Sequence, residues 1–452
     1  MSALGLCLAL MAAAPEADDA PPEEPAVSEA PDSALELDKL KDQLVIANAR
    51  LDALEKRQTF LSMMSARFSG YLDVGFFAVQ GNGSAVRKDF AHSQPQFDDL
   101  LGAWVLLGDP LGTAINSRGE PADIGDSRAI RFDPIHAGGH PSFIVNALNL
   151  GLFATLYEEL TVTASIDFLP RDRDLQDLRG LGDFFDLKLA YARYQFAVGP
   201  ALIAVYAGKF DSLHGVEYRN QESPERLGIT PSLICRYTCG RPVGLKANAG
   251  FFDRKLEVWL ALTNGSHQSD LFPFSNETDF NSGKTVSGRL QYKLPIGHKG
   301  IELSASGSIG SQDRQSDDSV LQWHYGFAAL VAVGDFTGSA EFVTGRALGK
   351  TDTAANVPCG AAPCLFYRGA YGQLAWRANR VLVPYARIDW RAATHRRGLD
   401  WAYVSDAIRG TFGLRADVTG FLVVKAEYVL NRENGIFEFP DDVFTTSLIL
   451  SY

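Results

Sequence analysis

The residues of this sequence that could have a chemical role are charged side chains. They fall into two groups, and neither group forms a catalytic set. The first group, of both signs, lies in the segment 211–241: Asp211, Glu217, Arg219, Glu222, Glu225, Arg226 and Arg236. The second group is basic and belongs to stretches in which polar and apolar residues alternate: Lys246, Arg289, Lys293, Arg387, Arg391, Arg409, Arg415 and Lys425. Acids of the same phase interleave with these bases: Asp167, Glu257, Glu302, Glu341, Asp389, Asp417 and Glu427. Such charges either act on ions in water or neutralise one another in pairs, and both interpretations stay open.

Motifs of enzymes are missing from the chain. No nucleophile motif assembles a Ser-His-Asp set, and no glycine-rich phosphate loop follows a strand and opens a helix. His136 and His140 are four residues apart, but Gly138 and Gly139 between them indicate a loop rather than a zinc-binding helix. We therefore expect no enzyme, no metal and no cofactor.

The cysteines indicate an oxidising compartment. Cys7 lies near the N-terminus, and the other four form two close pairs, Cys235/Cys239 and Cys359/Cys364, in loop-like sequence. We favour two local disulfides. A metal site is the alternative, although no histidine completes a set of four ligands at the usual spacing.

The elements that position the charges are β-strands. From Arg67 onward apolar and polar residues alternate with period 2, as where Ile301, Leu303 and Ile309 alternate with Glu302 and Ser308. Each run covers about ten residues, the length at which a tilted strand crosses a bilayer. The polar phase then faces a water-filled lumen, so the bases of the second group are expected to line a pore.

The spacing of the strands predicts their topology. The expected strands are 67–79, 142–156, 160–169, 184–197, 200–210, 242–252, 255–263, 285–294, 300–309, 322–333, 335–345, 367–377, 380–391, 407–417, 420–430 and 443–452. Long and short connections alternate without a break, which is typical of an antiparallel transmembrane β-barrel of about 16 strands with both chain ends on the short-turn side. The segment 100–107 resembles a strand but would break this alternation, so we place it within the first long loop.

The closing strand ends the chain on an aromatic residue. Phe444, Leu448, Leu450 and Tyr452 share one face. This ending resembles the C-terminal assembly signal of outer-membrane barrels, although phenylalanine is commoner than tyrosine at the last position.

Three further segments precede the barrel, which we expect over 67–452. Residues 1–14 resemble a secretory signal that lacks a basic start, and residues 15–33 form an acidic, Pro-rich linker with seven acids and no base. Over 34–61 seven apolar residues and one glutamine recur with spacings of 3 and 4: Leu37, Leu40, Leu44, Ala47, Leu51, Leu54, Gln58 and Leu61. The pattern predicts a periplasmic coiled-coil stem, with a lone amphipathic helix as the alternative.

Composition excludes two classes of protein. The mean hydropathy of -0.05 and the lack of a long apolar span beyond the first residues argue against a helical membrane protein. The net charge is -12 and the chain contains no basic patch, so nucleic acid is not an expected partner.

Signal, heptad stem, barrel and terminal aromatic together resemble the 16-stranded outer-membrane porins, in particular the phosphate-selective porin-like families. The stretch 208–219, GKFDSLHGVEYR, is similar to the short GKF…G.E segment of those families. The resemblance implies that the segment 211–241 folds into the barrel and sets a pore constriction. An extracellular loop folded over the rim is the alternative.

The expected function is a water-filled channel for passive diffusion of small hydrophilic solutes or ions in the Gram-negative outer membrane. The alternative is a structural protein whose stem tethers the membrane to the cell wall, with peptidoglycan as a partner. Expected partners of the channel are outer-membrane lipids, two further copies in a homotrimer, and the solutes. A receptor with a plug is disfavoured, because about 66 residues precede the first strand.

Overall fold

The structure of the protein is a computed structural model. It describes residues 65–79, 141–168, 185–220, 222–264, 281–296, 299–311, 321–347, 364–397, 401–433 and 442–452. The signal-like segment, the linker, the coiled-coil stem, the segment 100–107 and the histidines at 136 and 140 lie outside these residues, so those expectations stay predictions.

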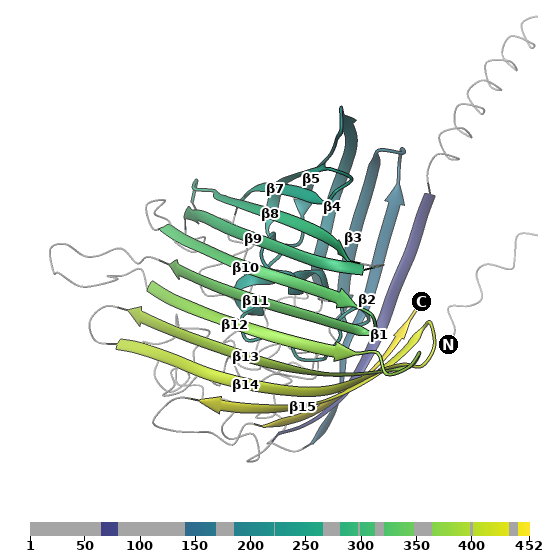
Figure 1. The fold of residues 1–452 in the computed structure, drawn as a ribbon, viewed down its shortest axis with the longest axis vertical. Coiled ribbons are helices and arrows are strands. Elements are labelled where there is room, and N and C mark those ends of the chain that lie inside the picture. Colours follow the sequence, from purple (N-terminus) through teal and green to yellow (C-terminus); the bar gives the residue numbers. More distant parts are fainter. Residues whose placement is uncertain are drawn as a thin grey trace, which may run out of the picture. The chain divides into compact units, whose positions relative to one another are not determined.

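The described chain is a closed antiparallel barrel of 16 strands, as the sequence predicts (Figure 1). The strands are β1 (Ser65–Val79), β2 (Ser142–Thr155), β3 (Leu160–Phe168), β4 (Phe185–Val198), β5 (Ala201–Lys209), β6 (Val243–Phe251), β7 (Leu256–Thr263), β8 (Thr285–Ile296), β9 (Lys299–Ser311), β10 (Leu321–Val333), β11 (Phe336–Ala347), β12 (Cys364–Trp376), β13 (Leu382–Arg397), β14 (Trp401–Asp417), β15 (Leu422–Glu433) and β16 (Val443–Ser451). Each strand pairs with its neighbours in sequence, and β1 closes the barrel against β16 from Tyr71↔Ser451 to Val79↔Val443. Closure leaves no unpaired sheet edge.

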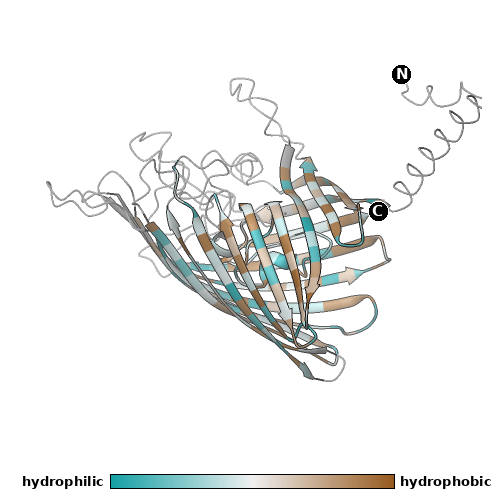
Figure 2. Cartoon of the chain, turned by 90° about the horizontal axis from the view of Figure 1, so that it is seen from above, coloured by the Kyte–Doolittle hydropathy of each residue, from teal (hydrophilic) through white to brown (hydrophobic). Residues whose placement is uncertain are grey.

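Alternation along the strands separates an apolar outer face from a polar inner face. In β13 Arg387 is 5% exposed, Ile388 is 64% exposed and Asp389 is 1% exposed. Figure 2 shows the same alternation as brown and teal bands along the strands. Phe444, Leu448, Leu450 and Tyr452 are all exposed, which confirms that these four residues share the outer face of the last strand.

Two β-bulges change the phase of this alternation. The register shifts between Asp73 and Val74 where β1 meets β2, and between Ser165 and Ile166 where β3 meets β4. The second shift leaves Lys188 of β4 without a partner in the ladder. A bulge re-aims a side chain in this way, and Lys188 is buried although its neighbour Leu187 is exposed.

Candidate functional site

The segment 211–241 connects β5 to β6 and lies within the ring of strands, as the teal ribbon of Figure 1 shows. It contains two short helical elements, η5 (Glu217–Asn220) and α4 (Cys235–Thr238). At its start Phe210 and Leu213 are buried together with Ala261 of β7. This apolar contact turns the chain inward as it leaves β5.

Acids of the inner wall accept hydrogen bonds from the backbone of the segment. Glu341 of β11 accepts from the amide of Val216 at 2.6 Å and from that of Glu217 at 2.5 Å. Glu427 of β15 accepts from the amides of Ile229 and Thr230, both at 2.8 Å. Wall carboxylates therefore satisfy backbone donors that would otherwise be buried without partners.

Arginines of β13 and β14 bind backbone carbonyls of the same segment. Arg387 donates to the carbonyl oxygens of Thr230 at 2.8 Å and Pro231 at 2.9 Å. Arg409 donates to Pro231 at 3.3 Å. Asp389 lies 2.9 Å from Arg387 and so balances part of the buried charge.

Two further bases fix the part of the segment that passes β14 and β15. Arg415 donates to the carbonyl of Arg226 at 2.8 Å. Lys425 donates to the carbonyls of Ser223 at 2.6 Å and Gly228 at 3.1 Å. Backbone oxygens of the segment thus accept hydrogen bonds from Arg387, Arg409, Arg415 and Lys425.

The first leg of the segment is held on the opposite side by β6 and β8. Lys246 donates to the carbonyl of Asp211 at 3.2 Å. Arg289 donates to the carbonyls of Leu213, at 3.2 Å, and Gly215. Contacts with β6, β8, β11, β13, β14 and β15 show that the segment crosses the interior of the barrel.

The basic residues of the wall were expected to face water, but the inserted segment buries most of them. Six of the eight bases are buried: Lys246, Arg289, Arg387, Arg391, Arg409 and Lys425. Lys293 and Arg415 keep part of their surface, with side chains 44% and 16% exposed. Alternation correctly predicted an inward direction for these bases, but not that protein instead of water would cover most of them.

An ionic network ties the segment to β1, β3 and β4. Lys188 Nζ lies 2.6 Å from Glu222 Oε2 and 3.1 Å from Asp167 Oδ2. Tyr71 donates to Glu222 Oε2 at 2.8 Å, and Arg241 Nη2 lies 3.3 Å from Glu222 Oε1. Burial alone would raise the pKa of Glu222, but the positive charges of Lys188 and Arg241 outweigh it and lower this pKa to about 2.

The other two glutamates of the segment have different surroundings. Glu217 accepts hydrogen bonds from the amide of Ser232 at 2.7 Å and from its hydroxyl. Burial raises the pKa of Glu217. Glu225 is exposed, and its pKa is raised by partial burial and by the negative charges of Glu222 and Asp211. Glu225 is therefore the glutamate of the segment with most access to water.

Arg219 points away from β1, β3 and β4 and contacts β8 and β9 instead. Its Nη2 lies 2.7 Å from Oε1 of Glu302 in β9 and donates to Gln291 of β8 at 2.5 Å. Its side chain is 29% exposed. Arg226, a second base predicted in this segment, donates from Nε to the carbonyl of Gly228 at 3.2 Å.

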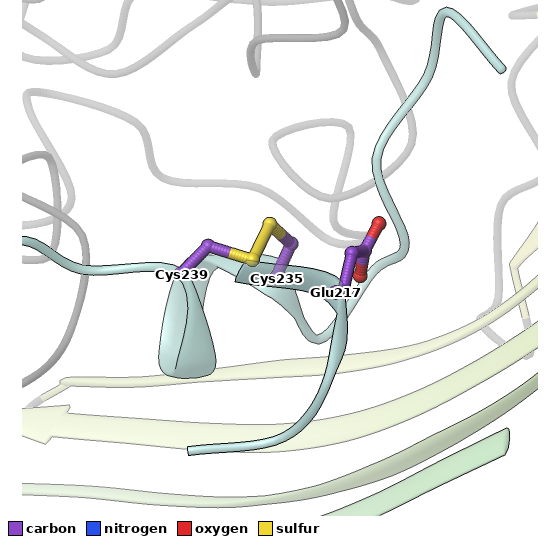
Figure 3. Close-up of side chains that lie close together, drawn as sticks. All are labelled: Glu217, Cys235 and Cys239. Atoms are coloured by element: carbon purple, nitrogen blue, oxygen red, sulfur yellow. A yellow bond between two sulfur atoms is a disulfide. The ribbon is translucent and has the colours of Figure 1, made fainter. Parts of the chain in front are cut away.

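A disulfide between Cys235 and Cys239 confirms one of the predicted pairs. Figure 3 shows it beside Glu217, whose carboxylate and the two sulfur atoms lie within 4.8 Å of one another. Oxidation removes the thiolates that would bind a metal at this place. Cys364 is also disulfide-bonded, whereas Cys359 lies outside the described residues, so the pairing of those two stays a prediction.

Sequence reasoning missed Lys188, Tyr71 and Arg241 as partners of the segment. A lone lysine between Leu187 and Leu189 was the available signal, because a charge in an apolar run is costly unless it points inward to a partner. The sequence contained no such signal for Tyr71 or Arg241. Tyrosine is ordinary in a strand, and Arg241 is one charge among many in a long connection.

Among the described residues, no helix is long and apolar enough to cross a membrane.

The fold and its interior define a class of protein: a closed 16-stranded antiparallel barrel with a charged inner wall and an inserted segment. It is similar to OmpF of Salmonella typhi in a complex with daunomycin, with a TM-score of 0.51 and 9% identity, covering 86% of this chain and 97% of that one. A loop L8 deletion mutant of OmpT, an outer-membrane protein of Vibrio cholerae, aligns with a TM-score of 0.49 and 10% identity, covering 86% and 100%. No family model and no curated protein matches the sequence. At this identity the likeness to OmpF shows a shared fold.

Proposed function

We propose that this chain is an outer-membrane porin, a channel through which small hydrophilic solutes or ions diffuse passively. The carrying observation is a closed barrel whose outer face is apolar and whose inner face is charged. Ile388, 64% exposed between buried Arg387 and Asp389, is the local example. An apolar outer surface suits hydrocarbon, and closure satisfies every strand hydrogen bond without water.

We further propose that the segment 211–241 forms the constriction. Its contacts with wall residues of β6, β8, β11, β13, β14 and β15 support this proposal. The charges that keep access to water there include Asp211, Arg219, Glu222 and Glu225, with side-chain exposures of 30%, 29% and 24% for the first three. These residues, with Lys293, are the proposed determinants of ion preference.

The assembly that goes with this function is a homotrimer in the outer membrane, with residues 34–61 as a periplasmic coiled coil. Nothing in the described residues favours the alternative of a cell-wall tether over a channel. A tether has no need to conduct, so conductance separates the two functions.

The test is the full chain reconstituted in planar bilayers. Stepwise increases in conductance and a defined reversal potential in a salt gradient are expected. Heat-modifiable migration on gels, which reports the folded barrel, serves as the control for folding. Folded protein that inserts into the bilayer without conducting would overturn the proposal of a diffusion channel.

A further inference from the structure

Two outward-facing arginines lie near the ends of β11 and β12 that are remote from the short turns, at the left of Figure 1. Arg346 shares its phase with exposed Phe342, and Arg368 shares its phase with exposed Phe366 and Leu374. Both arginines are exposed. Their neighbours of opposite phase face the interior, as the hydrogen bond that Glu341 of β11 accepts from the amide of Val216 shows.

The register places these two arginines beside each other. Arg346 pairs with Phe366 across β11 and β12, and Thr344, two residues before Arg346, pairs with Arg368. The arginines are therefore diagonal neighbours on one face, at a separation that long side chains bridge easily. A single anionic group lying against the outer wall can contact both guanidinium groups.

Aromatic rings hold the guanidinium groups against the wall. The guanidinium carbon of Arg346 lies 4.0 Å from the ring centre of Phe366, and that of Arg368 lies 5.5 Å from the ring centre of Trp390. Trp323 is the register partner of Arg346 on its other side. Stacking on a ring uses the flat face of a guanidinium group and leaves its N–H edge available for an anion.

No carboxylate among the described residues forms an ion pair with Arg346 or Arg368. The nearest acid in the register is Asp406, which lies two strands from Arg368, about 10 Å away. Asp406 accepts a hydrogen bond from Nε1 of Trp390 at 3.2 Å. Elsewhere on the outer face Arg432 lies 2.9 Å from Asp442, so an outward arginine need not lack a carboxylate.

We propose that Arg346 and Arg368 bind the phosphate-bearing headgroup of a membrane lipid at the long-loop rim of the barrel. The inference rests on the proposed membrane function, because the outer face must then meet lipid. Two cations that pair with no carboxylate of the described residues complement an anion, and tryptophan and phenylalanine beside them are suited to the boundary between hydrocarbon and water. A lipid fits better than free phosphate, because the site lies on the apolar outer wall and not along the interior.

The test compares the parent chain with R346Q/R368Q and with R380Q. Arg380 is an exposed arginine in the short turn between β12 and β13, so R380Q removes a similar charge from the opposite rim. Each protein is folded in neutral detergent, and binding of diphosphoryl lipid A is measured by native mass spectrometry. The double variant is expected to bind about tenfold more weakly, and R380Q as tightly as the parent.

Three outcomes would overturn the inference: equal binding by the double variant, equal loss in R380Q, and displacement of the lipid by inorganic phosphate at similar concentration. The last result would indicate a free-phosphate site instead of a lipid site. Conductance of each variant is measured alongside. A parent that conducts but binds no lipid A contradicts this inference alone, whereas one that fails to conduct contradicts the proposed function.

Discussion

Lys188 Nζ lies 2.6 Å from Glu222 Oε2, and this contact joins β4 to the segment 211–241. The lysine side chain is 7% exposed and has Asp167 as its second anionic partner. A buried ion pair loses much when one member is removed, because the other remains desolvated. The pair is therefore the first place to test how the segment is held.

Glu222→Gln should weaken attachment of the segment by about 2 kcal/mol, the usual magnitude for a hydrogen bond to a charged group. Asp167 keeps Lys188 paired, which limits the loss. Faster hydrogen exchange of backbone amides in 222–241 measures the effect. Glu225→Gln, at the exposed acid of the same segment, is the matched control and should leave exchange unchanged.

Acid should loosen the segment through Glu222. The pKa of Glu222 is lowered from its ordinary value of 4.5 to about 2. Its ionised form therefore stabilises the attached state fully above about pH 4.5, and this contribution disappears as the pH falls towards 2. Glu217 and Glu225 have raised pKa values and act in the opposite sense. The measurement is thus the difference in exchange between the parent and Glu222→Gln, which should shrink across this window. A difference that stays constant with pH contradicts the assignment.

Glu225→Gln should shift ion selectivity towards anions, whereas Glu217→Gln should leave it nearly unchanged. Glu225 is exposed, but Glu217 is bound to the amide and hydroxyl of Ser232. Reversal potentials in a salt gradient measure the shift. It should shrink as ionic strength rises, because the Debye length falls to about 3 Å at 1 M salt. Equal shifts in the two variants would place both carboxylates at the water path.

Glu427→Gln should release the middle of the segment. Glu427 accepts from the amides of Ile229 and Thr230, from the hydroxyl of Thr230 at 2.6 Å and from that of Tyr385. An amide at this position turns an N–H group towards donors, so a loss of about 3 kcal/mol in attachment is expected. Recordings of single channels measure this loss of attachment, and larger fluctuations of the open-channel current are expected for Glu427→Gln.

Glu257→Gln is the control for the variant at Glu427. Glu257 is a wall glutamate of similar burial that pairs with Arg254 at 2.8 Å and Lys293 at 3.4 Å. It forms no hydrogen bond with the described part of the segment. Equal current noise in the two glutamine variants would mean that the noise does not come from release of the segment.

The strands were predictable because their information is local. Alternation with period 2 marks a strand and assigns each residue to a face, and short connections mark hairpins. The predicted strand 242–252 differs from Val243–Phe251 by one residue at each end. The predicted strand 407–417 begins six residues after Trp401, since the early part of β14 is a strand through its pairing with β13 up to Arg397↔Trp401.

The sequence by itself determined the barrel, the number of its strands and the inward phase of the wall charges, because each depends on neighbours along the chain. Only the tertiary structure decided what those charges meet. Arg387 reaches the carbonyl of Thr230 across 157 residues, and Lys425 reaches that of Ser223 across 202. The alternation of polar and apolar residues gives the direction of a side chain, but it carries no information about which group that side chain contacts in the interior. The partners here are backbone groups of a segment whose path depends on many such contacts made together.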